Sequence, residues 1–178
     1  MSEDGEDIKL WLPKSPSDTF RATRLSVTST RLLVTSLHTH QLTQFDANGN
    51  KLRCIQLLDY IRPEHAVESP TGTFIISQYN ERLKKNQIIE VNNAGQELRQ
   101  FSRSLHTPHI AVDSHGNILL AVNRRILLLD NHLSLRRVII NEHQLNYKQP
   151  LRLCYMEQSG QLLVGSYHQV AVFDVLRH

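Results

Sequence analysis

Cysteine and glycine are sparse in this chain of 178 residues, which has two of the first and seven of the second. Cys54 and Cys154 lie far apart and neither belongs to a CxxC pair, so the sequence predicts neither a disulfide framework nor a zinc knuckle. The chain also lacks a GxSxG motif and a glycine-rich phosphate loop. These absences remove the common local signatures of hydrolases and nucleotide-binding enzymes.

Long hydrophobic runs are absent as well. No stretch approaches the ~18 consecutive apolar residues of a membrane-spanning helix. Residues 1–7 are acidic and carry no apolar core, so we expect no secretory signal. A hydrophobic content of 40% and a net charge of +3 are ordinary for a globular domain. We therefore expect a cytoplasmic protein without a membrane partner.

The clearest positive signal lies between residues 109 and 139. Four short apolar runs occur there, separated by turns rich in Asp, Asn, Ser and Gly. They are residues 110–112, 118–122, 126–129 and 133–139. Each run is too short for a helix and is rich in Ile, Leu and Val, so the segment predicts an antiparallel meander of four strands.

The same meander recurs along the chain. Its turn glycines, Gly72, Gly116 and Gly160, are spaced at intervals of 44 residues, and an earlier copy at 28–34 has lost the glycine. The repeats define four units, at about 22–57, 64–103, 108–140 and 150–178. Four strands per unit and a period of this length indicate propeller blades. We predict an all-β fold in which residues 1–178 form one propeller-like array of four four-stranded antiparallel blades.

The fourth unit ends after its third strand. Residues 7–12 resemble the outer strands at 51–57 and 97–101, so they are a candidate to pair with the last blade and close the ring. Alternatively, they are the end of a blade deleted from a longer parent. Both interpretations stay open at this point.

The repeated pattern resembles that of NHL repeats, which build the C-terminal propellers of tripartite-motif proteins. The pattern is a strand, Asp-x-x-Gly, an apolar strand, a loop, an apolar strand that ends in Asp or Asn, and then Leu-Arg. The resemblance covers most of the chain and implies a propeller that binds protein or RNA. Since the chain contains no RING, B-box or coiled-coil segment, the ubiquitin-ligase activity of such relatives cannot reside in it.

A propeller sorts its loops onto two faces, and here the two sets differ. One face carries small polar turns. The other carries the connections between blades and the loops between second and third strands, where cations alternate with tyrosines. We call this second set the loop face. Its candidate binding residues are Tyr60, Arg62, Tyr79, Arg82, Lys84, Lys85, Arg124, Arg125, Tyr147, Lys148, Tyr167 and His168.

Cations mixed with aromatic rings suit two kinds of partner. Single-stranded RNA would place its phosphates near Arg and Lys and stack its bases on Tyr. An acidic protein segment would pair its carboxylates with the same cations. The plain alternative is that these side chains are solvated loop tips. We predict a non-enzymatic module that binds a protein or single-stranded RNA without a cofactor, with self-association as a further way to complete an open array.

Ten histidines raise the alternative of a metal-dependent hydrolase or lyase. His38, His40 and His168 fall on loops of the first and last units, which become neighbours if the ring closes. No acidic residue stands beside these loops to orient the imidazoles, as metal-bound histidines usually require. We therefore predict no metal ligands and no catalytic residues. The histidines near blade starts, His65, His106 and His109, are interpreted as loop or packing residues.

Three outer strands carry an arginine at a matching position. They are Arg53, Arg99 and Arg136. Since cations on an outer strand discourage edge-to-edge association, we interpret these arginines as structural.

Overall fold

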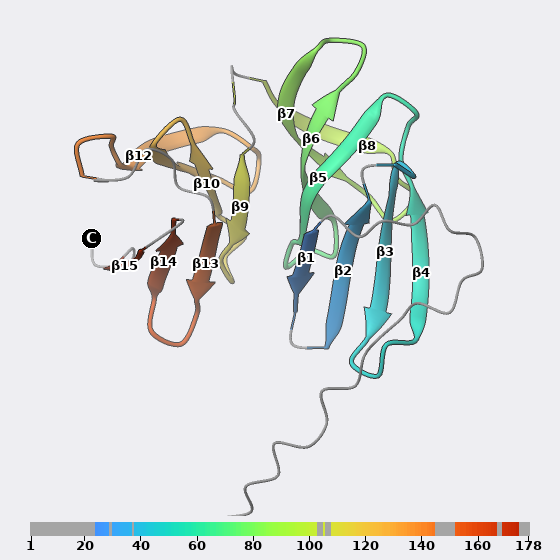
Figure 1. The fold of residues 1–178 in the computed structure, drawn as a ribbon, viewed down its shortest axis with the longest axis horizontal. Coiled ribbons are helices and arrows are strands. Elements are labelled where there is room, and N and C mark those ends of the chain that lie inside the picture. The colour runs from blue at the N-terminus through green and yellow to red at the C-terminus, as the bar shows by residue number, and fades with distance from the viewer. Residues whose placement is uncertain are drawn as a thin grey trace, which may run out of the picture.

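The computed structural model describes residues 24–28, 30–36, 38–102, 105, 108–144, 152–166 and 169–174. All regular structure in these residues is β-strand, and the strands form four antiparallel sheets (Figure 1). This part of the chain contains no helix that is long and apolar enough to span a membrane.

Each sheet is a meander of strands that follow one another in sequence. The first sheet contains β1 (Arg24–Val27), β2 (Arg31–Ser36), β3 (Gln41–Asp46) and β4 (Lys51–Gln56). The second contains β5 (Ile61–Glu68), β6 (Phe74–Asn80), β7 (Lys85–Val91) and β8 (Glu97–Phe101). The third contains β9 (His109–Val112), β10 (Ile118–Val122), β11 (Arg125–Leu129) and β12 (Leu135–Ile140). The fourth contains β13 (Arg152–Met156), β14 (Gln161–Gly165) and β15 (Val170–Asp174).

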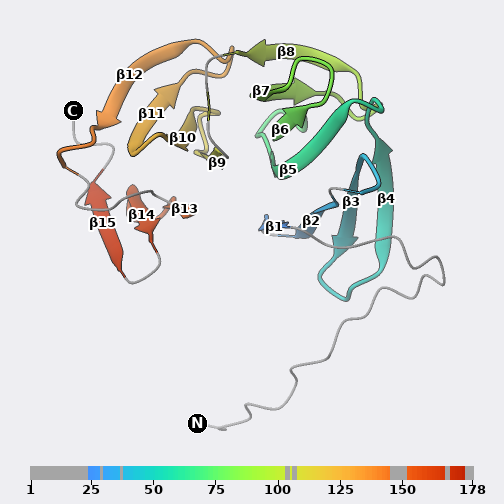
Figure 2. The same cartoon turned by 45° about the horizontal axis from the view of Figure 1, so that its top comes forward.

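The four sheets stand in an arc, with β1, β5, β9 and β13 toward the centre and β4, β8 and β12 on the outside (Figure 2). The predicted all-β class and the four-bladed propeller arrangement are confirmed. The fourth sheet has three strands among the described residues. The candidate closing strand at 7–12 lies outside the described residues, and within them no strand of the first sheet contacts one of the fourth.

Apolar clusters fill the three spaces between neighbouring sheets. Alternate residues of one strand serve two clusters: in β6, Phe74 and Ile76 face the first sheet, whereas Ile75 faces the third. In β10, Leu120 faces the second sheet and Leu119 faces the fourth. Because both faces are buried here, residues 118–122 of β10 and residues 74–76 of β6 are continuous apolar runs rather than alternating ones.

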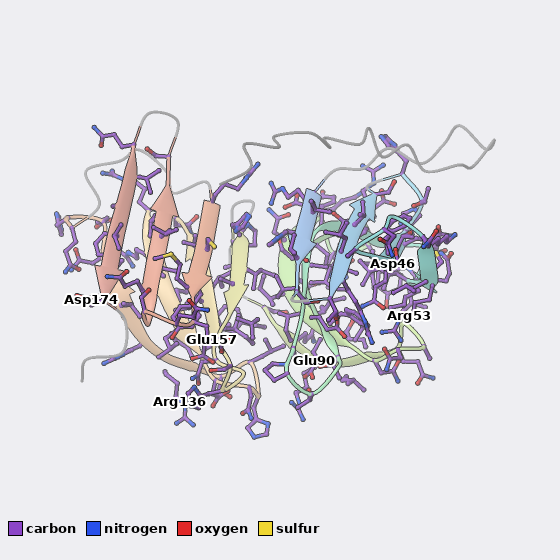
Figure 3. The ribbon with its side chains drawn as sticks, turned by 90° about the horizontal axis from the view of Figure 1, so that it is seen from below. Asp46, Arg53, Glu90, Arg136, Glu157 and Asp174 are labelled. Carbon is purple, nitrogen blue, oxygen red and sulfur yellow. The ribbon has the colours of Figure 1, made fainter. Side chains whose placement is uncertain are left out.

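The repeated arginines of the outer strands also join sheets to one another. The guanidinium carbon of Arg53 lies 5.3 Å from the ring centroid of Phe74 in the second sheet. Arg99 Nη1 donates to the carbonyl oxygen of Asn131 in the third sheet at 3.0 Å. Arg136 pairs within its own sheet, and Figure 3 shows Arg53 and Arg136 on opposite outer sides of the molecule. Two of the three arginines therefore stabilise contacts between sheets, which the expected edge role did not include.

The turn glycines have positive φ, and one of them also allows two sheets to approach closely. Gly72 and Gly95 have φ of 78° and 76°, values that L-residues rarely adopt. A Cβ on Gly95 would lie 2.0 Å from the carbonyl oxygen of Gln56 in the first sheet, whereas a Cβ on Gly72 meets nothing within 4 Å. Gly95 is thus required by the contact between two sheets as well as by its own backbone conformation.

Replacing each of these glycines by alanine separates the two requirements. Gly72→Ala is expected to lower the free energy of unfolding by about 1 kcal/mol, because only the left-handed conformation is strained. Gly95→Ala is expected to lower it by roughly 1–3 kcal/mol more, because the added methyl group also overlaps Gln56. Urea unfolding followed by circular dichroism measures both values. Equal losses in the two variants would contradict the described sheet contact.

Candidate functional site

Four basic side chains converge at the centre of the arc. Arg24, His109 and Arg152 are the first residues of β1, β9 and β13, and His65 occupies the matching level of β5. Their partners on the second strands are residues 35, 77, 121 and 165. Residues 35, 121 and 165 are the last or next-to-last residues of their strands, and residue 77 lies three residues before the end of β6. The convergence therefore occurs at the end of the sheets from which the loop face extends. We call these four residues, together with Glu64, the axial cluster.

The two imidazoles of the axial cluster are stacked and anchored to backbone. Their ring centroids lie 4.1 Å apart with an interplanar angle of 23°. His65 Nδ1 accepts the backbone N–H of Ile110 at 3.4 Å, and His109 Nδ1 accepts that of Leu153 at 3.2 Å. Each imidazole thus connects its own inner strand to the next sheet. Since Nδ1 accepts in both rings, the proton of each neutral imidazole resides on Nε2.

The surroundings keep both imidazoles neutral. Burial, followed by the charges of Arg24 and Arg152, lowers the pKa of His65 to about 3. Burial, followed by His65 and the two guanidinium groups, lowers the pKa of His109 to about 2. Burial and the neighbouring Arg152 also lower the pKa of Arg24, and Glu64 opposes that change. The positive charge of the cluster is therefore carried by its guanidinium groups.

Glu64 enters the cluster because β5 is irregular. Pro63 pairs with Gln78 and His65 with Ser77, so Glu64 is the extra residue of a β-bulge. Bulges redirect side chains and are frequent next to functional sites. Burial raises the pKa of the Glu64 carboxyl, while the charge of Arg24 acts in the opposite direction.

Two polar atoms of the cluster are buried without a hydrogen-bond partner in the described part of the chain. They are Arg24 Nη1 and Glu64 Oε2. The backbones of both residues are fixed, since the Thr35 hydroxyl contacts the carbonyl oxygens of Arg24 at 3.4 Å and Glu64 at 3.2 Å. Buried polar atoms are almost always paired in native structures, so an unpaired donor and an unpaired acceptor side by side indicate a place for a ligand.

The geometry of the axial histidines does not suit a metal ion. A metal-bound imidazole coordinates through one nitrogen and donates an N–H through the other, whereas His65 and His109 accept at Nδ1 and carry the proton on Nε2. Among the described residues no group of three His, Cys, Asp or Glu side chains could hold a metal. Of the loop histidines considered above, His40 has Nδ1 2.7 Å from the carbonyl oxygen of Ile61, and His168 lies outside the described residues.

The tyrosine and arginine residues of the second sheet form a compact group on the loop face. Arg62 and Tyr79 are cross-strand neighbours on β5 and β6. The guanidinium carbon of Arg82 lies 4.2 Å from the ring centroid of Tyr60, and Arg82 Nη2 lies 3.2 Å from a carboxylate oxygen of Asp59. The ring of Tyr60 is therefore covered by Arg82 on one side and packed against the core on the other.

The other predicted cations occupy loop tips. Lys84 and Arg124 both have positive φ, 52° and 61°, and lie in the loops β6–β7 and β10–β11. Lys84 and Lys85 are exposed, and no ion pair to either is found within the described ranges. Arg125 pairs with Glu142 at 3.4 Å. The candidate residues that the structure describes therefore belong to two adjacent sheets, the second and the third. The remaining candidates lie outside the described residues; they are Tyr147, Lys148, Tyr167 and His168.

The sequence did not predict the axial cluster, and His65 and His109 were interpreted as loop or packing residues. The residues carried a signal: a His or Arg stands directly before the apolar run of each unit. These dipeptides are Arg24-Leu25, His65-Ala66, His109-Ile110 and Arg152-Leu153. When the units are aligned by their turn glycines at intervals of 44 residues, His109 falls opposite Leu153 instead of Arg152. This offset of one residue hides the pattern in the last unit.

The opposite end of the central axis has a different character. An open cavity of about 580 Å³ is lined there by residues of all four sheets, among them Glu68, Asp113 and Glu157. Glu68 pairs with Arg31 at 3.4 Å, and Asp113 Oδ1 accepts backbone N–H groups of its own turn. Figure 3 shows Glu157 near the centre of the molecule. The axis is therefore basic at the loop face and acidic at the far end.

No protein-family model matches this chain, and no curated protein is significantly similar in sequence. Solved structures are similar in fold. A chain of the nidogen/laminin complex has a TM-score of 0.68 at 16% identity, over 88% of this chain and 61% of the other. Virginiamycin B lyase from Staphylococcus aureus has a TM-score of 0.57 at 12% identity, over 91% and 58%. A gluconolactonase from Xanthomonas campestris has a TM-score of 0.60 at 14% identity, over 84% and 56%.

The fold is a β-propeller. The chain spans about 60% of the length of these solved structures, and identities this low show the fold alone. The resemblance to NHL repeats is supported at the level of the propeller, not at the level of the tripartite-motif family.

The prediction that the chain is not an enzyme requires correction. Two of the similar structures are propeller enzymes, a lyase and a gluconolactonase. The absence of local catalytic motifs was the reason for the prediction, but propellers assemble their sites from residues on different blades, which local motifs do not reveal. Enzymatic status is therefore open.

The buried imidazoles predict a loss of stability in mild acid. The unfolded chain protonates both histidines as the pH falls below about 6.5, whereas the folded chain does so only near pH 3 and pH 2. The unfolded state therefore binds more protons across this window. The free energy of unfolding should fall by up to about 1.4 kcal/mol per pH unit for each histidine.

Thermal unfolding between about pH 7 and pH 5 tests this expectation. His109→Asn should reduce the slope of Tm against pH by about half, because one of the two groups is removed. The exposed His115 provides a matched control, and His115→Asn should leave the slope unchanged. A slope that is insensitive to His109→Asn would contradict the neutral buried pair.

Proposed function

We propose that the chain binds an acidic segment of a protein partner on its loop face. The observation that carries the proposal is the exposure of Lys84 and Lys85, to which no ion pair is found among the described residues. On the same face Arg62, Arg82 and Arg125 pair with acidic side chains of this chain. The guanidinium groups of the axial cluster lie at the same end of the propeller. A carboxylate-rich segment crossing this end would meet positive charge from several sheets.

Single-stranded RNA is the less favoured ligand because stacking needs accessible aromatic faces. Tyr60 is covered by Arg82, and Tyr79 is half-buried within β6. In the described part of the face both tyrosines are therefore partly buried, and one of the two rings is covered by a guanidinium group.

Fluorescence anisotropy with two labelled probes tests the proposal. One probe is an unstructured peptide of alternating glutamate and serine, and the other is an oligouridylate of similar length. Lys84→Ala with Lys85→Ala should weaken peptide binding roughly 3- to 10-fold, because two exposed charge contacts are lost. The matched control removes two equally exposed cations from outer strands, Lys51→Ala with Arg137→Ala, and should bind as the parent chain does.

Three results of the same titrations would contradict the proposal. Binding of the oligouridylate in preference to the peptide, with a steep salt dependence, would replace the acidic segment by RNA. Equal effects of the two double substitutions would show that only net charge matters. Binding of neither probe would remove the loop face as a polyanion site.

A further inference from the structure

We infer that the axial cluster is a binding site for a small carboxylate that bears a hydroxyl group on the adjacent carbon. The inference is independent of the acidic segment proposed for the loop face, since it depends on different residues. It combines an unpaired buried donor of Arg24, an unpaired buried acceptor of Glu64 and the two stacked imidazoles beside them.

The environment of Arg24 indicates that the ligand is an anion. Its Nη1 is buried and has no partner in the described part of the chain, and the neighbouring Arg152 adds positive charge. A buried guanidinium N–H without an acceptor is unfavourable, and a carboxylate satisfies it with a charge-assisted hydrogen bond. Glu64 does not fill this role, since no Arg24–Glu64 contact occurs among the ion pairs of the described residues.

The environment of Glu64 indicates that the ligand carries a hydroxyl group. Its Oε2 is buried, lacks a partner among the described residues, and is placed next to Arg24 by the bulge in β5. A carboxylate oxygen accepts hydrogen bonds, so the ligand must present a donor close to its own anionic group. A hydroxyl on the carbon next to the carboxylate places donor and anion close together, as the interaction of Arg24 with Glu64 requires.

The imidazoles favour an oxyanion over a cation. With Nδ1 of His65 and His109 held by backbone N–H groups, each ring has an N–H at Nε2 and no free lone pair. Both rings can therefore only donate to a ligand. Arg24 and Glu64 are only half-buried as whole residues, so a rotamer change of either side chain brings its unpaired atom to a ligand at the surface.

The test uses three probes that differ by one group each: lactate, propionate, which lacks the hydroxyl, and lactamide, which lacks the charge. Binding to the full chain is followed by chemical-shift titration up to about 50 mM. Lactate should bind about 5-fold more tightly than propionate, as expected for one hydrogen bond, and more than about 10-fold more tightly than lactamide. Glu64→Gln should reduce the preference over propionate, and Arg24→Gln the preference over lactamide.

A purely structural Arg24–Glu64 pair is the rival explanation, and Tm distinguishes it. If Arg24 serves a ligand, Arg24→Gln should leave Tm unchanged or raise it by about 2–4 °C while weakening lactate binding, because a buried N–H without a partner is removed. A lower Tm with unchanged binding would assign Arg24 to the fold. Arg31→Gln, at the other end of the axis, is the matched control and should bind lactate normally. Failure of lactate to bind the parent chain would overturn the inference.

Discussion

The whole arrangement depends on the need of each β-sheet to bury two apolar faces. A single meander cannot do so, and here the faces are covered by stacking sheet on sheet, with one apolar cluster in each of the three spaces. Stacking of twisted sheets in this way brings their first strands together at a common centre (Figure 2). The position of the axial cluster is therefore a consequence of hydrophobic packing rather than of any local sequence motif.

This convergence places several basic groups close to one another, which is electrostatically unfavourable. Two guanidinium groups and two imidazoles from four separate strands share a small, partly buried volume. The fold accommodates them by keeping both imidazoles neutral and by using each Nδ1 as an acceptor for the next inner strand. Packing alone would be satisfied by apolar residues at these positions. Retention of unpaired polar atoms at the point where four sheets meet is the kind of local conflict that marks functional sites.

The fold could be predicted from sequence because its signals are local and repeated. The spacing of Gly72, Gly116 and Gly160 reflects a turn that recurs once per sheet, and apolar runs such as 118–122 reflect burial on both faces. The axial cluster could not be predicted in the same way. The stacking of His65 on His109 depends on the distance between two inner strands, which no pattern within one repeat determines. The bulge that redirects Glu64 is a one-residue irregularity of β5 that no repeat pattern announces.

The loop face lies between these two cases. That Lys84 and Arg124 occupy exposed loops and Lys85 the exposed start of β7 follows directly from where the strands end. That Tyr60 is covered by Arg82 does not follow, because it depends on the conformation of the loop β6–β7. The prediction that the chain is not an enzyme failed for a similar reason, since an active site depends on contacts between distant segments. Motifs within one segment were absent, but sites built from several blades are invisible to a search for such motifs.

Long-range ¹H–¹⁵N correlation of the histidine side chains tests the central claim most directly. The claim is that packing holds His65 and His109 together as neutral rings with Nδ1 as acceptor. At about pH 5, both rings should give the spectrum of the neutral tautomer protonated on Nε2. A cationic ring at either position, or a proton on Nδ1, would contradict the claim.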